Sequence, residues 1–178
     1  LFYKTWVPDW TQGDITLHAI DSGFYCQDNA AALQALIYDE TGERGYITTE
    51  GATAGSTWEE FRIFTTQEQR KNLMSCILTR AINCDGMYTD LYPTNVVKLG
   101  EKLSLIDYDS FNSFSFLFDK KRAWYEKFDL DAWWKPHETA VRDTNKYYSE
   151  YFEKCLGTKL DFEIDSVESI EKMMSLLR

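Results

Sequence analysis

Two carboxylates and one carboxamide recur at ordered spacing in the segment YTDLYPTNVVKLGEKLSLIDYDS, residues 88–110. Asn95 follows Asp90 by five residues, and Asp107 follows a turn at Gly100 that is flanked by apolar runs. These runs predict a β-hairpin that brings Asn95 and Asp107 side by side at one end. Magnesium prefers oxygen ligands and usually completes its shell with water and substrate phosphates. The segment therefore predicts a hard-cation site with Asp90 nearby in the loop.

The elements before this hairpin read as helical. Apolar residues repeat at three- and four-residue spacing, which predicts one buried helical stripe; they are Leu73, Met74, Ile77, Leu78, Ala81 and Ile82. We expect this helix to end near Asn83. Ser56 with Glu59, and Thr66 with Gln69, fit the capping box that starts a helix.

Two further helices are expected after the hairpin. Aromatic residues from Tyr147 to Cys155 line one helix, which Gly157 should stop. Apolar residues from Val167 to Leu177 line another, which starts at Asp165 or Ser166.

The N-terminal third carries mostly strand signals. Residues 1–7 form a short aromatic and β-branched run that predicts a strand. Residues 30–38 fit either a helix or a strand, and we prefer a hairpin formed with residues 46–49. Residues 9–29 are interrupted by Gly and Asp, which predicts irregular structure. Residues 50–56, with two glycines, are the best candidate for a boundary between two lobes.

Composition excludes several classes of function. The 178-residue chain has a net charge of −10, which disfavours nucleic acid as a partner because its binders need basic surface. The four cysteines have no CxxC spacing and there are only two histidines, which argues against a zinc site and gives no support for a disulfide framework. We therefore expect a cytoplasmic protein. No apolar run approaches the roughly 18 to 20 residues of a membrane span.

The residues of the hairpin segment resemble a known family. Asp90-Leu91-Tyr92-Pro93-Thr94-Asn95 resembles the D-L-x-P-x-N catalytic loop of the protein-kinase-like superfamily. The segment Leu105-Ile106-Asp107-Tyr108-Asp109 resembles the metal-binding segment of the same superfamily. Its motif IDYD resembles the aminoglycoside phosphotransferase and small-molecule kinase branch more closely than it resembles ordinary protein kinases. The resemblance covers residues 46–110 well and the rest loosely.

The resemblance implies roles for the polar residues of this segment. Asp90 would accept or orient the hydroxyl that attacks the γ-phosphate of ATP. Asn95 would be the second catalytic residue of the same loop. Asn95 and Asp107 would hold Mg²⁺ against the phosphates. Asp109 could add a further metal-site oxygen or could simply cap a turn.

The resemblance also implies nucleotide-binding positions. Val97 and Ile106 match positions that line the nucleotide cleft, and Thr49 and Glu50 match the hinge whose backbone meets adenine. Lys4 stands where the family keeps the lysine that grips the α- and β-phosphates, although a lone Lys in a terminal strand is often only a surface residue.

Together these features predict an α+β, protein-kinase-like two-lobed fold. Residues 1–54 would form a reduced β-rich N-terminal lobe with the hinge, and residues 55–178 a helical C-terminal lobe. The expected function is an ATP- and Mg²⁺-dependent phosphotransferase that moves the γ-phosphate to a hydroxyl of a small molecule. A pseudokinase that binds nucleotide or serves as an interaction module is the alternative, and nucleotidyl transfer is a third hypothesis. The sequence does not indicate an oligomeric state.

Departures from the family pattern keep these alternatives open. No G-x-G-x-x-G precedes Lys4, so the loop that covers the phosphates is not found in the sequence. Tyr88 replaces the family's His, and Thr89 replaces the Arg that many regulated protein kinases carry before the catalytic Asp. No Ala-Pro-Glu follows Asp109, which favours a small-molecule acceptor over a peptide.

Overall fold

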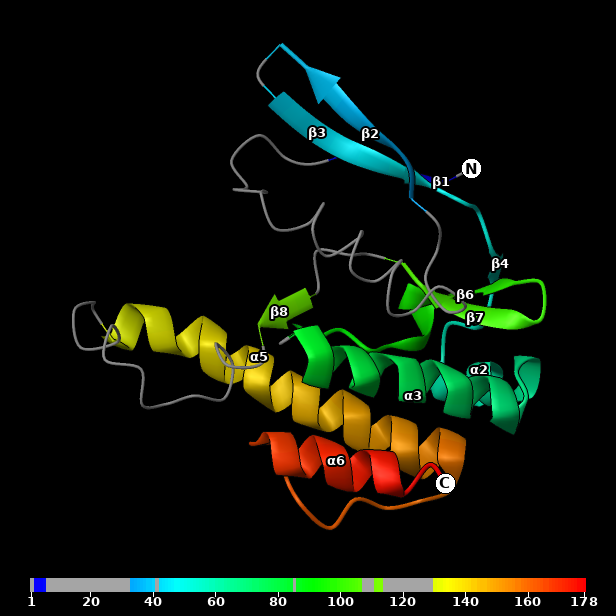
Figure 1. The fold of residues 1–178 in the computed structure, drawn as a ribbon, viewed down its shortest axis with the longest axis vertical. Helices are drawn as coiled ribbons and strands as arrows, with labels where there is room; N and C mark the ends of the chain where they lie inside the picture. The colour runs from blue at the N-terminus through cyan, green and yellow to red at the C-terminus, as the bar shows by residue number, and fades with distance from the viewer. Residues whose placement is uncertain (1, 6–32, 41, 85, 107–110, 114–129) are drawn as a thin grey trace.

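The computed structural model describes residues 2–5, 33–40, 42–84, 86–106, 111–113 and 130–178. It is a mixed α and β structure, compatible with the expected α+β class. In Figure 1 a sheet formed by the N-terminal strands stands at one end and the helices are packed together at the other. The hairpin that carries Asn95 lies between these two parts (Figure 1).

The N-terminal sheet is antiparallel with the order β1-β3-β2. Its strands are β1 (Phe2–Thr5), β2 (Leu33–Asp39) and β3 (Gly42–Thr48). The hairpin preferred for residues 30–49 is confirmed over its described strands, β2 and β3, and the helical alternative is wrong for residues 33–38. The β-branched and aromatic residues in both strands outweigh the helix preference of the three alanines at the start of the segment. The expected irregular segment, residues 9–29, lies outside the described residues.

A second sheet, with the order β4-β6-β7, contains the predicted hairpin. Its strands are β4 (Ala52–Thr53), β6 (Val96–Leu99) and β7 (Lys102–Leu105). The turn places Gly100 at φ 62°, a backbone conformation that glycine adopts without steric cost. β4 falls within the expected boundary segment and pairs with β6. A third pairing, between β5 (Gly86–Tyr88) and β8 (Phe111–Ser113), was not predicted.

The first two helices are α2 (Trp58–Phe64) and α3 (Gln67–Cys84). The capping box predicted at the start of α3 is confirmed, because Gln69 N–H donates to Thr66 Oγ1 and Thr66 N–H donates to Gln69 Oε1. The capping box predicted for α2, formed by Ser56 and Glu59, is wrong by one residue. Thr57 is the N-cap there and accepts from Glu60 N–H, since Thr57 is the residue that directly precedes the first helical turn.

The C-terminal helices are α5 (Leu130–Glu150), its π-helical continuation η4 (Tyr151–Leu156) and α6 (Val167–Ser175). The helix predicted around Tyr147 is thus confirmed but begins well before the aromatic stripe. Gly157 ends η4 at φ 73°, as expected for a left-handed cap. Ser166 caps α6 in a reciprocal pair with Ser169. No helix in the described ranges has the length and apolar character needed to cross a membrane.

One hydrophobic core joins the helices to the inner face of the β6–β7 hairpin. The stripe predicted on α3 is confirmed for its most buried members, and α5, η4 and α6 pack against it. The fully buried members include Phe61, Met74, Leu78, Tyr148, Phe152 and Ile170. Cys76 on α3 is disulfide-bonded, although the cysteine pattern of the sequence gave no support for a disulfide framework. Cysteine spacing alone could not show this bond because pairing is set by proximity in the fold.

Candidate functional site

Asp90 and Asn95 are brought together in the loop between β5 and β6. Asn95 Nδ2 donates to Asp90 Oδ2 at 2.8 Å and to the Asp90 carbonyl at 3.1 Å. The short helix η1 (Pro93–Asn95) closes the loop, with Tyr92 N–H donating to the Asp90 carbonyl at 2.8 Å. Because both amide hydrogens of Asn95 are used on Asp90, its Oδ1 is the atom left to act as a ligand. The predicted proximity of these two side chains is therefore confirmed.

Asn95 also stands at the end of the hairpin, as the sequence predicted. Ile106 N–H donates to the Asn95 carbonyl at 2.9 Å, which extends the β6–β7 ladder one pair beyond Val96 and Leu105. The next residue after Ile106 in the chain is Asp107. Asp107 and Asp109 lie outside the described residues, so their metal roles stay predictions.

The two faces of the hairpin differ. Val96, Leu103 and Leu105 are buried in the core on one face. Side chains alternate along a strand, so Asn95, Val97 and Ile106 share the other face. Val97 and Ile106 are half-buried, and their place in a nucleotide cleft stays a prediction.

The segment after β3 approaches this outer face of the hairpin. A Cβ added to Gly51 would lie 2.6 Å from Val97 Cγ2 and 2.8 Å from the Lys98 carbonyl, so only glycine fits there. The predicted hinge residues Thr49 and Glu50 directly precede this contact, with Thr49 half-buried and Glu50 exposed. The structure thus brings the hinge segment next to Val97.

Lys4 belongs to the N-terminal sheet. It lies in β1 opposite Tyr46 of β3. Its side chain is outside the described set, so its role in holding phosphates stays a prediction.

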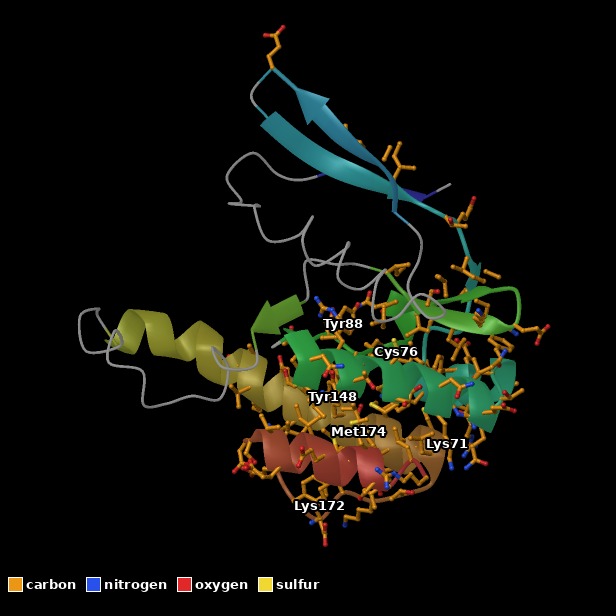
Figure 2. The ribbon with its side chains drawn as sticks, viewed as in Figure 1. Lys71, Cys76, Tyr88, Tyr148, Lys172 and Met174 are labelled. Atoms are coloured by element: carbon orange, nitrogen blue, oxygen red, sulfur yellow. The ribbon has the colours of Figure 1, made fainter. Side chains whose placement is uncertain are left out.

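The loop is also fixed by α5 through two buried tyrosines. Tyr148 Oη donates to the Tyr88 carbonyl at 2.8 Å, and Tyr88 Oη donates to the Ile106 carbonyl at 2.6 Å. Both side chains are fully buried, and both are labelled in Figure 2. Burial raises the pKa of Tyr148, so its phenol stays protonated and donates.

Aromatic rings hold the other side of the loop. The Tyr92 ring contacts Trp58 of α2 with a centroid distance of 5.5 Å and Tyr147 of α5 with a centroid distance of 5.8 Å. Trp58 Nε1 in turn donates to Glu150 Oε2 at 2.6 Å. Burial and then the negative charge of Asp90 raise the pKa of Tyr147.

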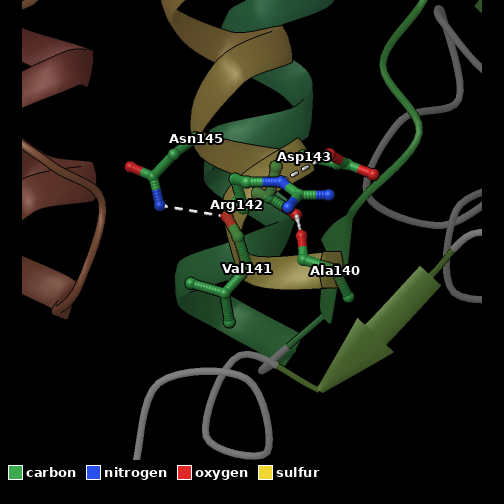
Figure 3. A network of polar contacts seen from close by, with 6 residues as sticks. Ala140, Val141, Arg142, Asp143 and Asn145 are labelled. Atoms are coloured by element: carbon green, nitrogen blue, oxygen red, sulfur yellow. Dashed lines mark hydrogen bonds and ion pairs between the residues drawn. The ribbon is translucent and has the colours of Figure 1, made fainter. Parts of the chain in front are cut away.

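The part of α5 that faces the loop is internally braced. Thr144 Oγ1 donates to the Ala140 carbonyl and Asn145 Nδ2 to the Val141 carbonyl, while Arg142 pairs with Asp143 at 3.5 Å (Figure 3). Asn145 also binds both backbone groups of Ile164, before α6. Of these contacts, only the two bonds to Ile164 reach outside α5, and they attach the helix from which Tyr147 and Tyr148 project to the segment before α6.

The donor set at the hairpin end fits a hard cation and not a soft one. Asn95 Oδ1 and the carboxylate of Asp90 are oxygen atoms, which Mg²⁺ prefers. Within the described part of the chain, no group of three or more His, Cys, Asp or Glu side chains forms a metal cage. A cation held here would therefore take further ligands from substrate phosphates, water or acids outside the described residues.

Sequence reasoning missed the contributions of Tyr147 and Tyr148. It placed both on one apolar stripe, but consecutive residues of a helix point about 100° apart. Tyr148 reaches the Tyr88 backbone, whereas Tyr147 contacts Tyr92 beside Asp90. The doubled Tyr was the available signal, because a buried Tyr hydroxyl usually needs an acceptor.

A separate pocket of about 430 Å³ lies between α3 and α6 and contains none of the predicted site residues. Lys71 and Met174, labelled in Figure 2, stand on its two sides. It is lined by Gln67, Glu68, Lys71, Asn72, Ser75, Met174, Leu177 and Arg178.

No protein-family model matches the chain, and no curated protein is significantly similar to it in sequence.

Proposed function

We propose that the chain is an ATP- and Mg²⁺-dependent phosphotransferase with a protein-kinase-like two-lobed fold, acting on a hydroxyl of a small molecule. The observation that carries the proposal is the double role of Asn95. Its side chain binds Asp90 while its backbone pairs with Ile106, the residue before Asp107. One residue thus links the proposed base to the proposed metal segment.

In this proposal each residue has a defined chemical role. Asp90 accepts or orients the acceptor hydroxyl, and Asn95 Oδ1 with Asp107 holds Mg²⁺ on the phosphates. Val97 and Ile106 provide an apolar surface against the adenine ring of ATP. The backbone of Thr49 and Glu50 meets the edge of the same ring. Positioning and charge neutralisation supply most of the catalysis in phosphoryl transfer. Because the chain is acidic, this proposal requires a bound cation to neutralise the charge of the phosphates.

A nucleotide-binding module without transfer is the second candidate. It is favoured by the 2.8 Å bond from Asn95 Nδ2, which already engages Asp90 Oδ2. In such a protein Asp90 would brace the loop and the acceptor hydroxyl would have no base.

The first test is titration calorimetry of ATP with and without Mg²⁺ on the wild type, Asp107→Asn and Asp90→Asn. We expect Asp107→Asn to lose the Mg²⁺-dependent binding, because a ligand of the cation is neutralised. Asp90→Asn should keep binding. Asp161→Asn is the control, since Asp161 is exposed and pairs with Lys172 on the α6 side.

Mass spectrometry after incubation with ATP and a panel of hydroxyl acceptors then separates the reaction types. A phosphorylated product that Asp90→Asn fails to form supports the kinase. A nucleotidyl adduct points to the third hypothesis, and binding without any product supports the second candidate. Absence of ATP binding in the wild type would refute all nucleotide-based functions.

A further inference from the structure

Two buried hydroxyls connect α5 to both parts of the proposed site. The first bond joins Tyr148 Oη to the Tyr88 carbonyl at 2.8 Å, and the second joins Tyr88 Oη to the Ile106 carbonyl at 2.6 Å. Tyr88 stands two residues before Asp90, and Ile106 directly precedes Asp107. Two hydrogen bonds, linked through the residue Tyr88 itself, therefore connect α5 to the backbone on each side of the site.

These bonds are well suited to fixing positions. Both tyrosines are 0% exposed. The bond to the Tyr88 carbonyl is buried and the bond to the Ile106 carbonyl is partly buried, and buried carbonyl groups require a partner. A Tyr side chain has only two rotatable bonds and a rigid ring, and the hydroxyl therefore holds its acceptor at a set distance from the helix. A shift of α5 would move the Tyr88 backbone and, through the Tyr88 ring, the Ile106 backbone.

We propose that Tyr148 and Tyr88 are positioning residues that set the separation between Asp90 and the metal-binding end of the hairpin. This inference rests on the proposed function for its catalytic consequence, but its geometric part does not. Neither hydroxyl touches the reacting groups. Each acts through a backbone carbonyl: that of Tyr88, two residues before Asp90, and that of Ile106, directly before Asp107.

The chain offers a matched control three residues further along. Tyr151 is also 0% exposed, and its hydroxyl donates to the Arg70 carbonyl at 2.8 Å. Arg70 belongs to α3, near the end that is remote from Asp90 in the chain. Tyr151→Phe therefore removes the same kind of bond as Tyr148→Phe without touching the loop.

Amide hydrogen exchange on the free protein tests the geometric part directly. We expect Tyr148→Phe and Tyr88→Phe to speed exchange at the Ile106 and Asn95 amides, which pair with the Asn95 and Tyr92 carbonyls. Tyr151→Phe should leave both amides at the wild-type rate. Unchanged exchange in the first two variants, or the same acceleration in all three, would overturn the proposal.

The Mg²⁺ dependence of ATP binding tests the functional part. Loss of an outer partner of a metal site typically weakens metal affinity by about 10-fold or more. We expect that loss for Tyr148→Phe and Tyr88→Phe, with ATP binding in the absence of Mg²⁺ unchanged and Tyr151→Phe within about 2-fold of wild type on the same scale. An equal loss in all three variants would mean that the bonds only stabilise the fold.

The two experiments fail in different ways. If the wild type binds no ATP, the proposed function is lost, whereas the exchange rates still decide whether the tyrosines position the loop. If ATP binds and exchange is unchanged in Tyr148→Phe, the positioning role is lost and the proposed function stands.

Discussion

Two regions of the molecule use buried side chains to hold backbone carbonyls, and they differ in what they leave exposed. The loop junction comprises Tyr88, Asp90, Asn95, Ile106 and Tyr148. The arginine junction comprises Thr65, Arg70, Tyr151 and Cys155. The first relies on uncharged donors and leaves the half-buried Asp90 near the surface, whereas every member of the second is buried.

The arginine junction is centred on one guanidinium. Arg70 donates to the Cys155 carbonyl at 2.8 Å and to the Thr65 carbonyl at 2.6 Å, and it accepts from Tyr151 through its own carbonyl. Burial raises the pKa of the Cys155 thiol to about 12, more than the positive charge of Arg70 lowers it. No side chain here is placed to react, so the network serves stability.

The comparison shows that similar hydrogen bonding has different consequences in the loop junction and in the arginine junction. In the arginine junction the charged guanidinium of Arg70 fixes α2, α3 and η4 to each other. In the loop junction the uncharged donors fix the backbone, and the side chain of Asp90 is only half-buried. Three variants below test this contrast, beginning with the largest expected effect.

Arg70→Met should lower the free energy of unfolding by about 3–5 kcal/mol, because it leaves buried carbonyls without a donor. Urea denaturation measures the loss. Arg62→Met is the control, since Arg62 is exposed on α2 and its replacement should stay within about 0.5 kcal/mol. A loss below about 1 kcal/mol for Arg70→Met would show that the arginine junction is not a stabilising centre.

Gly51→Ala should cost about 1–3 kcal/mol, because its methyl group would overlap Val97 and the Lys98 carbonyl. The same overlap should push the hinge segment off the hairpin and weaken ATP binding, which calorimetry would detect. Gly100→Asn is the matched control, since Gly100 has φ 62° with open space around it and Asn tolerates that conformation. Wild-type stability in Gly51→Ala would contradict the close approach.

Thr57→Ala should cost about 1 kcal/mol, because Thr57 caps α2, the helix that leads into the arginine junction. Ser56→Ala should change stability little, since the bond at Ser56 to Glu60 uses its backbone N–H. Thermal unfolding of the pair decides between the cap in the structure and the cap predicted from sequence. A larger loss of stability for Ser56→Ala than for Thr57→Ala would instead support Ser56 as the N-cap, as predicted from the sequence.

The sequence predicted the site's local geometry well because that geometry depends on short-range patterns. Alternation on both sides of Gly100 is sufficient to specify the hairpin and to place Asn95 at its end. In the structure the partner of Asn95 is Ile106, and the predicted neighbour Asp107 lies outside the described residues. The capping box at Thr66 and Gln69 is likewise encoded within four residues. Each of these features could be read without knowing the rest of the fold.

The parts that were missed depend on residues far apart in the chain. The bond from Tyr148 to Tyr88 spans 60 residues, and the one from Trp58 to Glu150 spans 92. The β5–β8 pairing and the disulfide at Cys76 are also set by tertiary proximity. Periodicity reports which face of a helix is buried, but it does not identify the partner of a buried hydroxyl.

The distance of 60 residues between Tyr88 and Tyr148 has a consequence for synthesis of the chain. At roughly 5–20 residues per second, a ribosome needs about 3–12 s to add that many residues. During that interval the nascent segment carrying Asp90 and Asn95 exists without the helix that anchors it. The hairpin can pair early from local contacts, and the finished arrangement of the loop waits for the last third of the protein to emerge.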